Sequence, residues 1–195
     1  MAEKQVVTEV AETNEVVEKA KDFWSRFSKP IIIVGGALIL AIGGWLGYKN
    51  LVKIPNENKA AEMIFPAEQL FSKMVQTGFG KDSINLVLNG GNGLTGVLKV
   101  ANNYGGTAAG NRAHYIAGAC YINSKDFNNA VKHLKGFSTP ATQVQTAAYS
   151  LLGDAYSELK KNDEALEFYK KAADLNPKDE FMTAEALFKA GLFAE

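Results

Sequence analysis

The stretch YSLLGDAYSELKKNDEALEFYKKAADLNP, from Tyr149 to Pro177, decides the fold that we expect for this chain of 195 residues. Large and small residues recur in it at the spacing of helical faces. The positions that carry the pattern are Tyr149, Leu152, Gly153, Tyr156, Ala165, Tyr169, Ala172 and Pro177. Because small residues such as Gly153 and Ala165 let two helices approach closely, the stretch predicts a hairpin of two packed α-helices.

The same spacing resembles the tetratricopeptide repeat, W-x2-L-G-x2-Y followed by A-x3-F and P, with aromatic residues exchanged for one another. A degenerate copy lies 35 residues earlier, at Ala117, Gly118, Tyr121, Ala130 and Leu134. We therefore predict an all-α solenoid of helical hairpins, with repeats at about 111–144 and 146–179 and a third begun at 184. The apolar last helix further predicts either that the native protein continues beyond Glu195 or that these residues cap the array.

A second segment, from Pro30 to Tyr48, contains no charged residue. Its 19 residues would form a helix about 28 Å long, close to the hydrocarbon thickness of a bilayer. Nine of them are Ile, Leu or Val, whose insertion is favourable by about 0.3 to 0.6 kcal/mol each. The segment predicts a transmembrane helix. A cleaved signal peptide and a buried core helix are the alternatives, and the long polar stretch before the segment argues against the signal peptide.

Basic residues flank this predicted span on both sides: Lys19, Lys21, Arg26 and Lys29 before it, and Lys49, Lys53 and Lys59 after it. The small excess before the span favours a cytoplasmic N-terminus and an exported C-terminal domain. Within the span, Gly36, Gly43 and Gly47 fall on one helical face and are candidates for close packing of transmembrane helices. Glycine that is merely tolerated in an apolar helix is the alternative.

Three regions follow from these patterns. Residues 1–29 are predicted to form a cytoplasmic tail, partly disordered and partly an amphipathic helix next to the membrane; residues 30–48 form the transmembrane helix and residues 49–195 the repeat domain. In that domain we expect helices at about 55–76, 94–104, 107–123, 126–137, 141–160, 163–175 and 180–195. The segment 77–93 is predicted to be a loop, Gly105 a left-handed helix end and Thr107 a helix cap. No strand is expected.

The composition argues against several classes of function. The chain has 21 basic and 21 acidic residues, so it lacks the basic excess of a protein that binds nucleic acid. Its single cysteine, Cys120, excludes an internal disulfide and argues against a metal cluster. The two histidines, His114 and His133, have structural interpretations within the first repeat. Since no catalytic constellation is found, we expect neither enzyme activity nor a cofactor or metal.

In a tetratricopeptide array the first helices line a concave groove, and the repeat register assigns residues to it. The candidate protein-binding residues are Arg112, Tyr115, Ile122, Asn123, Ser150, Asp154, Ser157, Glu158 and Phe188. The lysine and asparagine clamp with which some tetratricopeptide cochaperones hold acidic C-termini is absent from these positions. A peptide or a partner helix is the expected ligand, and a groove filled by the chain's own helices is the alternative.

Four further segments contribute to a second resemblance: Lys19-Ala-Lys-Asp-Phe-Trp24, Gly44-Trp45, Ala60-Ala61 and Tyr104-Gly-Gly-Thr-Ala-Ala-Gly-Asn-Arg-Ala113. Together with the layout of the chain, they resemble the ancillary subunits of the bacterial Sec translocon, in the form found in Bacteroidota-type bacteria. The resemblance implies a single-pass inner-membrane protein whose periplasmic domain assists secreted polypeptides. Its implied partners are the SecYEG channel and a membrane-anchored, prolyl-isomerase-like chaperone. A scaffold of another envelope or organelle import complex is the alternative.

Overall fold

The computed structural model describes residues 2–175, 177 and 179–193. The chain divides into two compact units, Met1–Val52 and Lys53–Glu195. Each unit is built almost entirely from helices.

The first unit is a long helix, α1 (Ala2–Tyr48), followed by a π-helical turn, η1 (Lys49–Lys53). It begins within the tail that the sequence predicts to be partly disordered. No glycine interrupts the chain before Gly35, and the helix continues through Pro30. The side chains of Val17, Trp24 and Phe27 are exposed. Since they lie seven and three positions apart, they fall on one face, as an amphipathic helix requires.

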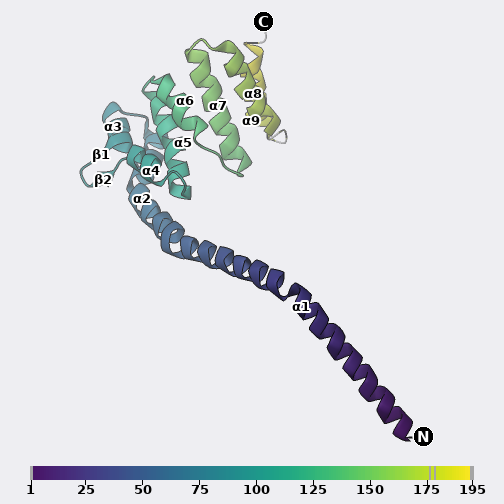
Figure 1. Cartoon of the computed structure of the whole chain (residues 1–195). Coiled ribbons are helices and arrows are strands. Elements are labelled where there is room, and N and C mark those ends of the chain that lie inside the picture. Colours follow the sequence, from purple (N-terminus) through teal and green to yellow (C-terminus); the bar gives the residue numbers. More distant parts are fainter. Residues whose placement is uncertain (1, 176, 178, 194–195) are drawn as a thin grey trace. The chain divides into compact units, whose positions relative to one another are not determined.

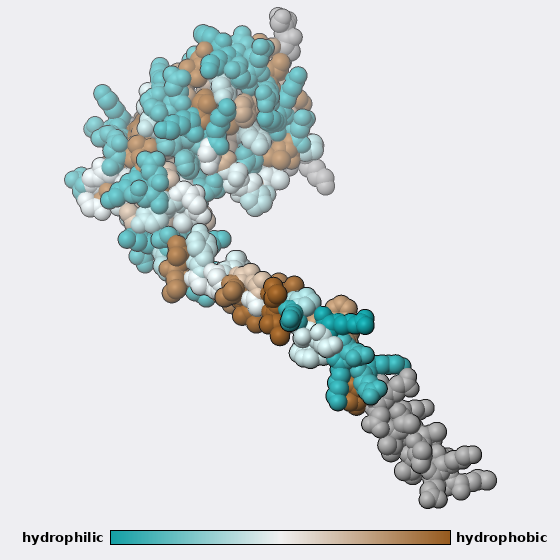
Figure 2. Space-filling view, viewed as in Figure 1, coloured by the Kyte–Doolittle hydropathy of each residue, from teal (hydrophilic) through white to brown (hydrophobic). Residues whose placement is uncertain are grey.

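The apolar part of α1 is long and apolar enough to cross a membrane, judged by length and composition. Figure 2 shows it as a band of hydrophobic atoms along the helix of the first unit. None of its most apolar window is buried within the protein, and Ile33, Ile39 and Leu40 are each more than two-thirds exposed. The structure therefore does not support the alternative of a buried core helix.

The second unit is a series of helices that pack against their neighbours in chain order (Figure 1). Its helices are α2 (Ile54–Thr77), α3 (Lys81–Asn89), α4 (Val97–Tyr104), α5 (Ala108–Asn123), α6 (Phe127–Lys135), α7 (Thr142–Glu158), α8 (Asn162–Leu175) and α9 (Glu180–Gly191). The first repeat of the sequence forms the hairpin of α5 and α6, and the second forms the hairpin of α7 and α8. The predicted solenoid of helical hairpins is confirmed.

The two hairpins repeat one another with the period of 35 residues that the sequence predicts. The turn between α5 and α6 contains Lys125 with φ +63°, and the turn between α7 and α8 contains Lys160 with φ +59°. The glycine of each first helix also lies against the same position of the second helix. A Cβ atom at Gly118 would lie 2.5 Å from Leu134 Cγ, and one at Gly153 would lie 2.5 Å from Tyr169 Cδ1. Only glycine allows the two helices of each hairpin to approach this closely.

An additional helical layer precedes the two repeats. Helix α2 packs against α4 and α5, and α4 packs against α5, so α2 takes the place of a further first helix. The buried residues that join these helices and α3 are mostly small or aliphatic; they include Ala60, Ile64, Ala67, Val87, Val97, Val100, Ala113 and Ala117. The helical array therefore begins well before the first repeat that the sequence reveals.

Three predictions for the segment before α5 are wrong. The segment 77–93 contains helix α3, because Ile84, Val87 and Leu88 form a buried helical face. Its glycines then form a short antiparallel hairpin in which β1 (Gly90–Gly91) pairs with β2 (Leu94–Thr95), although no strand was expected. Gly105 has φ −54° rather than a left-handed conformation. By contrast, the cap at Thr107 is confirmed, since its side chain accepts a hydrogen bond from the Gly110 amide.

The remaining helices agree with their predicted ranges to within a few residues, with one larger difference at the C-terminal end. Helix α9 ends at Gly191 rather than at 195, and residues 194–195 lie outside the described residues. The sequence also predicts a turn at Asn176-Pro177, and Asn176 lies outside the described residues. Asp179 caps α9, since its Oδ1 accepts a 3.0 Å hydrogen bond from the Met182 amide.

The substitution Gly153→Ala should destabilise the second unit. The added methyl group would collide with the ring of buried Tyr169, and overpacking of this kind costs about 1–3 kcal/mol, more than the ~1 kcal/mol that alanine gains in a helix. Gly191→Ala is the matched control, because no atom lies within 4 Å of a Cβ placed there. Urea unfolding followed by circular dichroism should show a lower midpoint for the first variant only. An equal or higher midpoint for Gly153→Ala would contradict the close approach.

Candidate functional site

Most of the residues that the sequence assigns to one groove line two different pockets. Arg112 and Tyr115 line the larger, which has a volume of about 660 Å³ and which we call the α2 pocket. Ile122, Asp154, Ser157 and Glu158 line a smaller one of about 280 Å³, together with Tyr169. Six of the nine candidate residues thus line one or other of these two pockets, and their use as a single binding groove stays a prediction.

The α2 pocket lies between α2, α5 and the segment that leads into α7. Its apolar lining includes Phe71, Tyr115, Ile116, Phe137, Pro140 and Val144. The rings of Tyr115 and Phe137 pack with their centroids 5.1 Å apart, and burial raises the pKa of Tyr115. The neutral phenol is thus the form that the pocket presents at physiological pH.

Two opposite charges meet at the edge of the α2 pocket. Arg112 donates a 2.6 Å hydrogen bond from Nε to the Glu68 carboxylate. Because Glu68 belongs to α2, the chain's own helix covers part of the face of α5 that the repeat register assigns to a binding groove. This pair neutralises Arg112, and whether a partner or the chain's own helices occupy the groove stays open to test.

The smaller pocket is organised around Asp154. Its Oδ1 accepts a 2.8 Å hydrogen bond from the Tyr169 hydroxyl and a 3.0 Å hydrogen bond from Lys189 Nζ. Burial and the hydrogen bond to Asp154 raise the pKa of Tyr169. Burial alone would lower the pKa of Lys189, but the hydrogen bonds to Asp154 and Glu185 outweigh burial and raise it. Asp154 therefore joins α7, α8 and α9 and has a structural role.

Comparison with known proteins agrees with this architecture for the second hairpin. Residues 146–179 match the family described as the tetratricopeptide repeat. No curated protein and no solved structure gives a significant match to the chain. The matched residues include most of the hairpin of α7 and α8 and the contact between Gly153 and Tyr169 within that hairpin. Repeats of this kind typically serve as scaffolds for protein partners and not as enzymes.

The other predicted residues lie outside both pockets. Asn123 ends α5 and donates a 2.9 Å hydrogen bond to the Ala119 carbonyl, and Ser150 lies on the first helix of the tetratricopeptide repeat. Phe188 on α9 is 70% exposed. In the first unit, no atom lies within 4 Å of a Cβ placed at Gly36, Gly43 or Gly47. The close packing of this glycine face against another helix stays a prediction.

The two histidines form a pair between α5 and α6. His133 Nδ1 lies 3.3 Å from His114 Nδ1, and the Tyr121 ring stacks on His133 with centroids 5.6 Å apart. Burial, with smaller contributions from His114 and Lys132, lowers the pKa of His133 to about 4. Burial, followed by Lys132, also lowers the pKa of His114. Both rings are therefore neutral at physiological pH, and one Nδ1 proton can be shared between them.

The features of metal and thiol sites are not found among the described residues. No group of three or more His, Cys, Asp or Glu side chains there is placed to hold a metal ion. Cys120 is buried, and burial raises the pKa of its thiol to about 12. A thiol in that environment stays protonated and unreactive.

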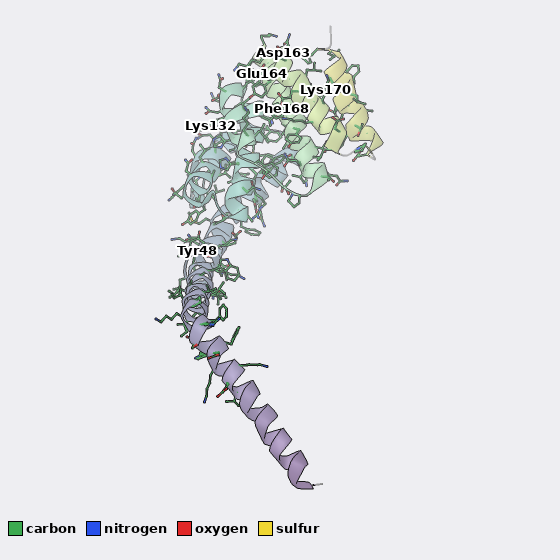
Figure 3. All side chains as sticks on the ribbon, turned by 45° about the vertical axis from the view of Figure 1, so that its right-hand side comes forward. Tyr48, Lys132, Asp163, Glu164, Phe168 and Lys170 are labelled. Carbon is green, nitrogen blue, oxygen red and sulfur yellow. The ribbon has the colours of Figure 1, made fainter. Side chains whose placement is uncertain are left out.

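The outer face of α6 and α8 is charged and includes Lys132, Asp163, Glu164 and Lys170, which Figure 3 labels. Lys171 forms a 2.5 Å ion pair with Glu167 one turn earlier. Exposed pairs of this kind contribute at most about 1 kcal/mol. These charged residues therefore form a solvated helical face.

Sequence analysis missed the residues that α2 and the segment before α7 contribute to the α2 pocket. Glu68 and Phe71 lie in a helix without a recognisable repeat pattern. Phe137 was expected at the end of the helix 126–137, and residues 138–140 were expected to form a turn. The helical spacing of Ala60, Ile64 and Ala67 is the sequence signal that could have identified Glu68 and Phe71. It places Phe71 next to the packed face of α2.

The histidine pair should make stability depend on pH. Between about pH 4 and pH 6.5 the unfolded chain binds a proton at His133 that the folded chain does not, so stability falls as the pH is lowered through this window. The expected slope approaches about 1 kcal/mol per pH unit. Urea unfolding at about pH 7 and about pH 5 should show this loss, and His133→Gln should reduce it. An unchanged slope in that variant would contradict the assignment.

The substitution Tyr169→Phe should destabilise the second unit by about 0.5–1.5 kcal/mol, because it removes one hydrogen bond to Asp154 and keeps the ring against Gly153. Tyr149→Phe is the control, since the structure assigns the Tyr149 hydroxyl no hydrogen bond within the described residues. The free energy of unfolding in urea should separate the two variants. Equal stability of Tyr169→Phe and the original chain would show that the hydrogen bond contributes nothing net.

Proposed function

We propose that this chain is a membrane-anchored scaffold that brings other proteins together and is ancillary to the bacterial Sec translocon. The observation that carries the proposal is the presence of a tetratricopeptide repeat and a helix able to cross a membrane in the same chain. A repeat scaffold presents extended surfaces to protein partners. A transmembrane helix confines that scaffold to one membrane.

The proposed partners are the SecYEG channel and a membrane-anchored, prolyl-isomerase-like chaperone, and the proposed cargo is the secreted polypeptide as it emerges. The resemblance of Lys19 to Trp24, of Gly44-Trp45 and of Tyr104 to Ala113 to the ancillary subunits supports these partners. The excess of basic residues before the span supports a cytoplasmic N-terminus and a periplasmic repeat domain at the inner membrane.

Tethering explains why weak contacts would suffice for this function. Two proteins held in the same bilayer meet at a high effective concentration, so their complex forms without a tight interface. In the smaller pocket the Asp154 carboxylate is already paired with Lys189. Binding of protein partners is the activity that we propose.

Affinity purification of the full chain after crosslinking in membranes should recover the SecYEG channel and a periplasmic chaperone. In a control chain, another single-pass apolar helix replaces residues 30–48. This control chain should recover the same chaperone, because we expect the repeat domain to bind the chaperone. Recovery of neither protein would overturn the translocon proposal. Recovery of an outer-membrane assembly or organelle import complex would instead support the alternative scaffold.

The orientation has a separate test. A reporter that is active only outside the cytoplasm, fused after Glu195, should be active when the full chain is produced in a bacterium. The same reporter fused before Met1 is the control and should be inactive. The reverse pattern would place the repeat domain in the cytoplasm and contradict the proposed compartment.

A further inference from the structure

We propose that the α2 pocket binds a large apolar side chain of an uncharged polypeptide segment that lies along α2. The proposal goes beyond the proposed function, since it names a site and the chemistry of its ligand. It does not require the translocon, because the pocket is formed entirely within the second unit.

The size and lining of the α2 pocket suit a bulky apolar side chain. Its volume of about 660 Å³ falls in the usual range for ligand pockets, about 300–1,000 Å³. Phe71, Tyr115, Ile116 and Phe137 supply aromatic and aliphatic walls. Val144 lines the pocket and is 43% exposed, so apolar surface here remains open to solvent in the described structure. An aromatic or branched side chain entering the pocket would remove that surface from water.

The pocket continues along α2, and this shape favours a polypeptide over a compact ligand. A second hollow of about 470 Å³ shares Glu68 and Ser72 with the α2 pocket. Phe65, Gln69 and Gln76 also line this second hollow. Each of them lies three or four residues from Glu68 or Ser72 along α2, so the five residues follow one face of the helix. The amide side chains of Gln69 and Gln76 can each donate and accept hydrogen bonds. They can therefore pair with the N–H and C=O groups of a peptide backbone.

The charges at the pocket favour an uncharged segment. Glu68 and Arg112 pair with one another across the edge of the α2 pocket, so the pocket has no net charge. A charged side chain placed there would lose its hydration without gaining a free partner, which is unfavourable. The neighbouring hollow contains one cation, Lys73, which lies outside the lining of the α2 pocket.

The wall opposite α2 is held in place before any ligand arrives. Asn111 donates a 2.8 Å hydrogen bond to the Ser138 carbonyl and accepts one of 3.1 Å from the Ser138 amide. The Thr139 amide donates a 2.8 Å hydrogen bond to the Gln145 side chain. A wall that is already ordered reduces the entropy lost on binding.

The test measures binding of short fluorescent peptides to the full chain in lipid nanodiscs, which keep detergent alkyl chains away from the pocket. The probe peptide has one central phenylalanine among Gly, Ser and Asn residues. Two further peptides carry alanine or aspartate in its place. We expect saturable binding of the phenylalanine peptide, and affinities about tenfold weaker for the other two, since one buried aromatic anchor can dominate a small interface.

Two tryptophan variants locate the site. Ser72→Trp should reduce the affinity about tenfold, because exposed Ser72 lines both hollows and the indole ring would fill them. Ser72→Ala should leave the affinity within about twofold. Ser157→Trp places the same ring in the smaller pocket. This variant should also leave the affinity for the phenylalanine peptide unchanged. Circular dichroism of each variant checks that the fold is retained.

Each outcome bears on the proposal. Loss of binding in Ser72→Trp alone supports it. Equal binding in Ser72→Trp, equal binding of the alanine peptide, or no saturable binding of the phenylalanine peptide would overturn it. These peptides contain no translocon component, so the peptide-binding and crosslinking experiments are independent. Absence of peptide binding would not contradict the proposed translocon function, and absence of crosslinked partners would not contradict the proposed pocket.

Discussion

The close approach of the two helices in each hairpin is the constraint on which the second unit depends. It requires a residue without a side chain at Gly118 and Gly153, because Leu134 and Tyr169 occupy the space that a methyl group would need. At Gly153 the contact extends further, since the same tyrosine donates a hydrogen bond to Asp154, which also binds Lys189. One glycine thus fixes the position of α8 against α7, and through Asp154 that of α9 against both.

Interactions within the chain also distinguish the inner surface from a groove with free charges. Residues that the repeat register exposes on the first helices have partners within the chain: Arg112 with Glu68, and Asp154 with Tyr169 and Lys189. Neutralised pairs on a partly exposed surface contribute little to stability. Their main effect is to remove free charge, so the two pockets differ from a clamp built to hold carboxylates.

Much of the repeat region could be predicted because helical periodicity and a fixed 35-residue period report directly on packing. The apolar span was equally visible, since nineteen residues without charge are rare in a water-exposed helix. Helix α3 was missed because the glycines at 90, 91 and 93 dominate the composition of its surroundings, although Ile84, Val87 and Leu88 already form one face. The α2 pocket could not be predicted, because it depends on a tertiary contact between α2 and α5 that no local pattern encodes.

The contribution of α2 changes how the inner surface should be understood. In a regular array every inner helix belongs to a repeat, and recognition is distributed over equivalent positions. Here the first inner helix has no repeat signature, yet it supplies Glu68, Phe71 and Ser72 to the α2 pocket. Its buried face is made of small residues such as Ala60 and Ala67, so α2 packs closely on α4 and α5. Glu68, Phe71 and Ser72 lie at or beside that face and line the pocket. The regular hairpins then provide a rigid support, and the irregular helix provides the surface on which specificity can develop.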